Sequence, residues 1–375
     1  MFINDELIRA ENLSLSKEMA ANRIYTLNEI LNGKNEIVVA NLASVLRFLP
    51  EKQVFLDNTI KFKVGQEINL IEVKKKLVKA GYFQVNKVDQ SLQFASRGDI
   101  LDIYSVNYDD AIRIELFGDE IESIRFFDIA TQTSKEEISK VDILPANDFL
   151  FTEEESKAAP EIIMSQLEKD KEHLHPSDFD NLRNVVESDI QDILEYNYSP
   201  NLYRYYSLIS KSKTSLVDYC SDYDVVLVDE HALSESAQLM NEEASTFLYE
   251  LFESGKAISH LSLFFDFDRL HFNRSRLIRT AVLQRDERDI TFNCKNVPFE
   301  SNKDIDAVNI IRSYTNLNYK VNISLDSKEQ LESLIDLLNS ENLPFEMVDA
   351  FSLPSKRQVG LAISSLPIYF LIKDN

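Results

Sequence analysis

Glycine is scarce in this sequence, with 7 residues among 375, whereas average usage is about 7%. Loops that cradle phosphate groups use glycine heavily, and the sequence contains neither GxxxxGK[ST] nor GxGxxG. Cysteine is scarcer still, because Cys220 and Cys294 are the only two and lie far apart. This usage indicates a reducing compartment and argues against a disulfide scaffold or a zinc site. These absences leave no recognisable nucleotide loop, metal site or catalytic set.

Long apolar runs are missing as well. No segment approaches the roughly 20 apolar residues that a membrane-spanning helix needs. The first residues, MFINDELIRAENLS, lack the basic segment and the apolar stretch of a secretory signal. We therefore expect a cytoplasmic protein without a membrane partner.

Basic residues are few beside acidic ones, with 40 Lys and Arg against 63 Asp and Glu and a net charge of -23. Binding to nucleic-acid phosphates needs clustered Lys and Arg, and an acidic protein repels nucleic acid at long range. Only short basic patches occur, such as Lys74-Lys75-Lys76. The charge therefore argues against duplex DNA as the main partner and favours a basic protein surface.

The pattern of predicted elements is that of an α/β protein with several domains. Residues 1–59 read as helix, a short buried strand at 37–40 and helix, which is the first part of an α/β module. One helix followed by a run of strands indicates a small α+β domain at 60–148. Residues 149–288 are mainly helical and continue the module, and 289–375 alternate like a small α/β domain.

The most informative segment is a predicted hairpin. Two alternating strands, 111–117 and 120–128, are joined at Gly118, a residue that suits a tight hairpin turn. Because strand side chains alternate, Arg113 and Phe117 share the face that should be wet. An arginine and an aromatic on a wet face are typical of a protein-binding surface. The alternative is local: Arg113 would pair with a neighbouring acid and Phe117 would pack under a loop.

Two groups of residues are of types that bind metal ions, but each lacks the neighbouring residues or the spacing that a metal site needs. Asp229 and Glu230 follow the stretch VVLV, as in a Walker B element that holds Mg²⁺ beside a nucleotide. The phosphate loop that should accompany them does not occur, which favours a relic or a solvated strand end. His173 and His175 could bind a metal with Glu172, but their spacing does not bring both to one helix face. We interpret them as a surface pair.

The segment RGDILDIY, followed by RIELFGDEIESIR and FD-ATQ-S, resembles a domain shared by the excinuclease subunit UvrB and the bacterial transcription-repair coupling factors. The flanking segments RIYTLNEIL and IVVANLASVLRFLP are similar to the coupling factors. The resemblance implies a partial helicase-like α/β module, without a functional phosphate loop, into which a UvrA-binding domain is inserted at 60–148. It also implies an N-terminal part of a larger protein. Further domains of that protein would bind RNA polymerase and, with ATP and Mg²⁺, move along double-stranded DNA.

The resemblance also implies site residues, because Arg97, Arg113 and Phe117 match the family's positions that contact UvrA. Two residues depart from the pattern: Ala95 replaces an arginine of UvrB-like sequences, and Asp99 replaces a glycine of many coupling factors. The implied function is that of an adaptor, not an enzyme, which recruits UvrA to stalled RNA polymerase and needs no cofactor of its own.

Two other functions stay open at this point. One is an ATP-dependent helicase module of the UvrB type, which would bind nucleotide at Asp229 and Glu230. The other is an autoinhibitory clamp, in which the module packs on the translocase motor and masks the UvrA surface.

Overall fold

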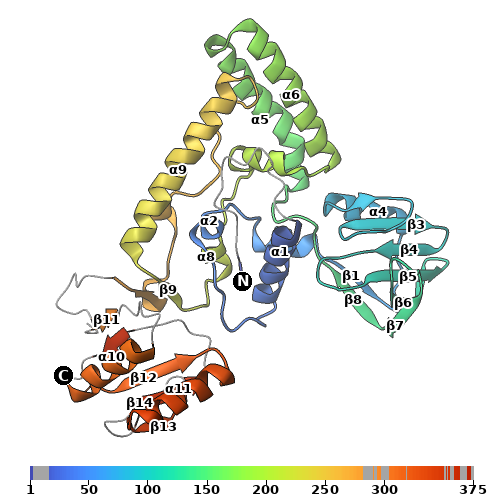
Figure 1. The fold of residues 1–375 in the computed structure, drawn as a ribbon. Helices are drawn as coiled ribbons and strands as arrows, with labels where there is room; N and C mark the ends of the chain where they lie inside the picture. Colours follow the sequence, from blue (N-terminus) through green and yellow to red (C-terminus); the bar gives the residue numbers. More distant parts are fainter. Residues whose placement is uncertain are drawn as a thin grey trace. The chain divides into compact units, whose positions relative to one another are not determined.

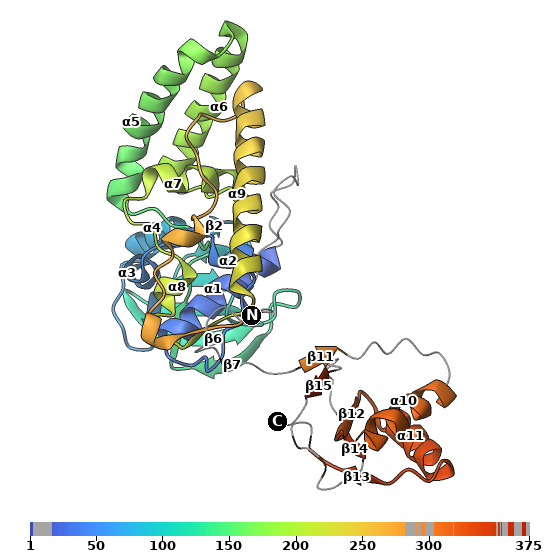
Figure 2. The same ribbon diagram turned by 90° about the vertical axis from the view of Figure 1, so that its left-hand side faces the viewer.

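The computed structural model of the chain has two compact units, Met1–Val282 and Leu283–Asn375, which Figures 1 and 2 draw from two sides. The described residues are 1–2, 17–281, 290, 294–296, 304–317, 319–349, 352, 354, 359–363 and 370–372. Within these ranges, no helix is long and apolar enough to cross a membrane.

Residues 60–143 form a small α+β domain within the first unit. Its main sheet has the strand order β2-β3-β4-β5-β6-β7, and all neighbours are antiparallel except β2 and β3. One helix, α4 (Leu70–Lys79), and the antiparallel pair β1–β8 complete the domain (Figure 1). The strands are β1 (Ile60–Lys63), β2 (Phe83–Gln84), β3 (Gln93–Arg97), β4 (Ile100–Ile103), β5 (Ala111–Phe117), β6 (Glu120–Phe127), β7 (Ser134–Ile138) and β8 (Lys140–Ile143).

Alternation along β5 decides which face of the main sheet is covered. Ile112 and Ile114 are fully buried, and they share one hydrophobic cluster with Val73 and Leu77 of α4. Each aliphatic side chain buried in this way stabilises the fold by about 1.5–3 kcal/mol relative to an exposed one. The helix therefore packs on the face that the even-numbered residues of β5 form, and the odd-numbered residues point away from it.

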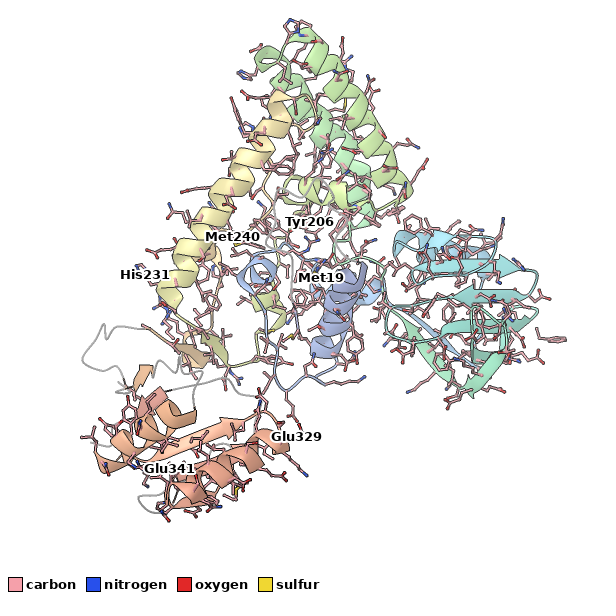
Figure 3. The ribbon with its side chains drawn as sticks, in the orientation of Figure 1. Met19, Tyr206, His231, Met240, Glu329 and Glu341 are labelled. Atoms are coloured by element: carbon pink, nitrogen blue, oxygen red, sulfur yellow. The ribbon has the colours of Figure 1, made fainter. Side chains whose placement is uncertain are left out.

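The remainder of the first unit is mainly helical. The neighbouring helices α5 (Glu153–Asp170) and α6 (Pro176–Glu195) enclose an aromatic-rich core that includes Tyr206, labelled in Figure 3. A capping box formed by Thr152 and Glu155 begins α5. The other elements are α1 (Lys17–Leu31), α2 (Leu42–Val45), α3 (Lys52–Asp57), α7 (Tyr206–Ile209), α8 (Leu216–Tyr219), β9 (Val225–Leu227), α9 (Glu230–Glu253) and β10 (Leu277–Arg279), with 3-10 turns at Lys171–His173, Pro200–Tyr205, Phe267–Arg269 and Arg274–Arg276.

The buried strand predicted at 37–40 is wrong. Ala40 forms only an isolated bridge with Phe2, and Ile37 is 82% exposed. A run of four apolar residues matches a buried strand in composition, but burial needs neighbouring strands. No further strand pairs with this segment among the described residues.

The second unit is a small α/β arrangement around a parallel sheet with the strand order β12-β14-β13. Its elements are α10 (Asp304–Asn316), β12 (Val321–Leu325), α11 (Lys328–Ser340), β13 (Phe345–Met347) and β14 (Val359–Ile363), together with the pair β11 (Cys294–Asn296) and β15 (Phe370–Ile372). Leu331 and Leu338 of α11 are buried against Val359 and Leu361 of the central strand. This amphipathic helix thus covers the sheet, as its apolar spacing indicates.

A buried carboxylate joins the α+β domain to the helical part. Asp148 lies five residues after β8, and its oxygens accept hydrogen bonds from Arg23 at 2.7 Å and from Arg47 at 2.8 and 3.1 Å. All three side chains are buried, and the Arg47 guanidinium lies 3.7 Å from the centroid of the Tyr203 ring. Arg23 and Arg47, which come from two other segments of the chain, therefore fix the position at which the chain leaves the α+β domain.

Replacing Asp148 with Asn should lower the free energy of unfolding of the first unit by about 3–5 kcal/mol, because it removes the negative charge that both buried guanidiniums contact. Urea unfolding followed by circular dichroism measures the change. The matched control is Glu72→Gln, which removes only the exposed pair with Lys75 and should cost less than about 1 kcal/mol. Equal costs for the two variants would contradict the assignment.

The contribution of Asp148 should also depend on pH. Burial alone would raise the pKa of Asp148, but the charges of Arg23 and Arg47 outweigh burial and hold the pKa below its ordinary value. A group whose folded-state pKa is depressed stabilises the fold above its unfolded pKa of about 4 and loses that effect as the pH falls. The difference in unfolding free energy between the wild type and Asp148→Asn should therefore stay constant from pH 7 to about pH 5 and shrink as the pH falls below about 4. A difference that stays constant down to about pH 3 would contradict this reasoning.

Candidate protein-binding site

The face of the main sheet that points away from α4 carries the predicted site residues, and we call it the outer face. Strand register places Asp102 opposite Arg113 and Arg113 opposite Arg125. Arg97 lies opposite Ile100, which in turn lies opposite Glu115. Because cross-strand neighbours point to the same side, these rows define the outer face as Arg97, Ile100, Asp102, Arg113, Glu115, Phe117 and Arg125.

The Arg113 guanidinium is held from several sides. Its Nε and Nη2 donate to the two carboxylate oxygens of Asp102 at 2.7 and 2.8 Å, and Nη2 also donates to the Gln132 side-chain oxygen at 3.2 Å. The guanidinium carbon lies 4.4 Å from the centroid of the Phe127 ring. The hydrogen bonds to Asp102 raise the pKa of Arg113 above its ordinary value, so this side chain presents a permanent, oriented charge.

Charges on the outer face are paired rather than clustered by sign. Arg113 and Arg125 lie directly opposite each other, an arrangement that destabilises a sheet unless it is compensated. Asp102 compensates Arg113, and Glu115 accepts a 2.5 Å hydrogen bond from Arg125. A partner would therefore meet alternating charges in fixed places, which favours recognition by arrangement over long-range attraction.

Arg97 and Phe117 stand at the ends of two tight turns. Gly98 follows Arg97 with a φ of +56° and Gly118 follows Phe117 with a φ of +65°, a backbone region that glycine enters without steric cost. The Arg97 side chain is exposed and donates a hydrogen bond to the Asn86 carbonyl. The turns thus bring both side chains to one end of the outer face.

Phe117 is 80% exposed, although an aromatic ring in a sheet usually packs against neighbours. The local alternative from the sequence is therefore wrong for this residue, because no loop covers it. It is confirmed for Arg113, which pairs with Asp102. By strand rise, Arg113 and Phe117 are separated by roughly 13 Å.

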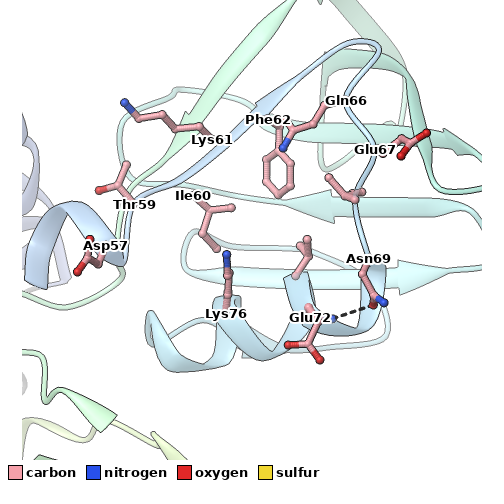
Figure 4. A pocket seen from close by; sticks show the side chains of 12 residues that line it. Asp57, Thr59, Ile60, Lys61, Phe62, Gln66, Glu67, Asn69, Glu72 and Lys76 are labelled. Carbon is pink, nitrogen blue, oxygen red and sulfur yellow. Dashed lines mark hydrogen bonds between the residues drawn. The ribbon is translucent and has the colours of Figure 1, made fainter. Parts of the chain in front are cut away.

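A cavity of about 290 Å³ lies between β1 and α4, away from these residues (Figure 4). Phe62 and Val73 contribute apolar surface, and Lys61, Glu67 and Lys76 bring charges of both signs. None of the predicted site residues lines it. The candidate site is therefore an exposed surface and not a pocket.

Asp229 and Glu230 have structural partners in the folded chain. Asp229 adopts a φ of +55° at the start of α9, where its carboxylate accepts a hydrogen bond from the Ala232 N–H at 3.3 Å. Glu230 pairs with Arg279 at 2.7 Å. The strand before them, β9, is not the fully buried strand of a Walker B element, because its middle residue Val226 is 54% exposed. The two acids thus cap a helix and join two segments, which agrees with the strand-end interpretation.

The histidine pair also has a local role. His175 caps α6 by accepting a hydrogen bond from the Ser177 N–H at 3.4 Å. No group of three metal-ligating side chains is present in the part of the chain that the structure describes.

Residues 60–149 match the model of the UvrB interaction domain family. This match covers the α+β domain and the segment up to Asp148, which ties the domain to the helical part. Fold and family match together identify this region as a UvrB interaction domain.

The similarity extends over most of the chain. The transcription-repair-coupling factor of Bacillus subtilis is 32% identical over 285 residues, or 72% of this chain and 23% of that protein. The Staphylococcus aureus protein of the same name, from strain RF122, is 27% identical over 352 residues, or 90% of this chain and 30% of that protein. The chain belongs to the transcription-repair-coupling factor family and spans less than a third of the length of these relatives.

The sequence did not reveal three residues that hold Arg113. Asp102, Phe127 and Gln132 come from β4, β6 and the turn after β6. A two-residue turn sets the register of β3 with β4, but the longer connection between β4 and β5 leaves their register open in the sequence. The alternation of side chains along the strands restricts the possible partners of Arg113 to acidic residues on its own face of the sheet. It does not tell which of these acids pairs with Arg113.

Exposure predicts different stability costs for two neighbouring positions of β5. Replacing the exposed Phe117 with Ala should change the free energy of unfolding by no more than about 0.5 kcal/mol. Replacing the fully buried Ile114 with Ala should cost about 2–5 kcal/mol. Thermal and urea unfolding measure both. A large cost for Phe117→Ala would mean that the ring packs against the protein in solution.

Proposed function

We propose that this chain binds UvrA through the outer face of its UvrB interaction domain, with Phe117 as the apolar contact and Arg97 and Arg113 as flanking cations. The exposed ring of Phe117 is the observation that carries the proposal. The ring stands just before the tight turn at Gly118, is 80% exposed, and shares the outer face with Arg97 and Arg113. Aromatic and arginine side chains in such a setting are the residue types that dominate protein–protein affinity.

The proposed role is recruitment of the excision-repair machinery to stalled RNA polymerase. Membership of the transcription-repair-coupling factor family supports this role. We assign to this chain only the UvrA-binding step. Contacts with RNA polymerase and with DNA are proposed for other parts of such a protein, because a net charge of -23 disfavours binding to nucleic acid by this chain.

The two alternative functions receive no comparable support. A helicase module needs acids free to hold Mg²⁺, whereas Asp229 and Glu230 contact the α9 backbone and Arg279. An autoinhibitory clamp would cover the outer face with the translocase motor of a longer protein, and no observation on this chain favours it.

The double variant Arg113→Ala with Phe117→Ala should weaken UvrA binding at least tenfold, because truncation of a hot-spot residue typically costs about 2 kcal/mol or more. Titration of purified UvrA in a calorimeter or by fluorescence anisotropy measures the affinity. Circular dichroism should show an unchanged fold.

The matched control for this prediction is Glu72→Gln on α4, which removes an exposed ion pair on the covered side of the sheet. Its UvrA affinity should equal that of the wild type. Unchanged affinity of the double variant, or an equal loss in the control, would contradict the proposed site.

A further inference from the structure

Arg113 is the most constrained charged residue of the outer face. The carboxylate of Asp102 accepts two of its hydrogen bonds, Gln132 accepts a third, and the Phe127 ring lies under its guanidinium. The side chains of Arg113 and Asp102 are only 18% and 15% exposed, whereas those of the helix pair Lys75 and Glu72 are 64% and 60% exposed. Water therefore screens this pair less than an ordinary surface pair.

Gln132 contributes to this arrangement from a strained backbone position. Its φ is +60°, a region that is uncommon for any residue other than glycine, asparagine or aspartate. The turn that leads to it is built on Asp128, whose carboxylate accepts hydrogen bonds from the N–H groups of Ala130 at 3.0 Å and Thr131 at 2.8 Å. Glycine would fit position 132 with less strain. A glutamine there gains a hydrogen bond with Arg113, the one ionic side chain to which it hydrogen-bonds in the part of the chain that the structure describes.

We propose that Asp102, Gln132 and Phe127 are positioning residues, which hold the Arg113 guanidinium in the single orientation that UvrA contacts. This inference rests on the proposed function and deepens it. A guanidinium is a planar fork, so its orientation decides which acceptors on a partner it can reach. Fixing that orientation before binding avoids the entropy cost of ordering a long side chain at the interface. Asp102 and Gln132 would thus raise the affinity through Arg113.

A double-mutant cycle tests this inference with the full chain and purified UvrA. Asp102→Asn and Gln132→Gly are each made in the wild type and in an Arg113→Ala background. In the wild type, each should weaken binding by about three- to tenfold, the cost expected for reordering one long side chain. In the Arg113→Ala background, each should have almost no further effect, because its target is gone.

Gln132→Gly separates positioning from general destabilisation. Glycine relieves the backbone strain, so the thermal unfolding temperature should stay equal or rise while UvrA affinity falls. A variant that acted through the fold would lose stability and affinity together. Glu72→Gln again serves as the control that leaves both unchanged.

The outcomes distinguish the inference from the function on which it rests. Equal losses in both backgrounds, or no loss from Asp102→Asn and Gln132→Gly when Arg113→Ala itself weakens binding, would overturn the positioning role alone. An Arg113→Ala variant with unchanged affinity would overturn the role of Arg113 in the proposed UvrA site and, with it, the inference.

Discussion

The buried ion cluster of Asp148 with Arg23 and Arg47 is the interaction on which the rest of the first unit depends. The α+β domain begins and ends with paired strands, because Phe62 in β1 lies opposite Val141 in β8. The chain thus enters and leaves the domain at one place, and Asp148 anchors that place to α1 and to the segment that follows α2. A buried carboxylate and buried guanidiniums offset their loss of hydration only when they hydrogen-bond in good geometry, as these three side chains do. The cluster therefore fixes how the outer face is presented by the helical part.

The two faces of the main sheet differ in role. Even-numbered residues of β5 build the core beneath α4, while Arg113, Glu115 and Phe117 lie on the outer face, which ends in an exposed ring. Asp102 and Glu115 neutralise Arg113 and Arg125, so the charge that remains on the outer face comes from Arg97. Binding would depend on matching a fixed pattern of charges around Phe117. Such a surface suits a specific adaptor in a protein whose overall charge is strongly negative.

Local rules predicted the elements that depend on local chemistry. Alternation in 111–117 and glycine at position 118 determine a hairpin and its two faces, and both were found as predicted. The predictions that failed concerned features that depend on contacts between residues distant in sequence. The apolar run at 37–40 is ambiguous without its neighbours, and it proved exposed. The partner of Arg113 required the register across the β4–β5 connection, which no turn residue sets. The resemblance named the site residues, but it did not reveal that Arg113 is already bound to Asp102.

The central claim is that UvrA meets the outer face and not the helix-covered face. A photo-reactive phenylalanine analogue placed at position 117, and separately at position 71, tests it most directly. Ile71 is 62% exposed and lies on α4, so it reports on the opposite side of the same domain. After irradiation with purified UvrA, we expect a covalent adduct from position 117 and none from position 71. An adduct from position 71 without one from position 117 would contradict the account.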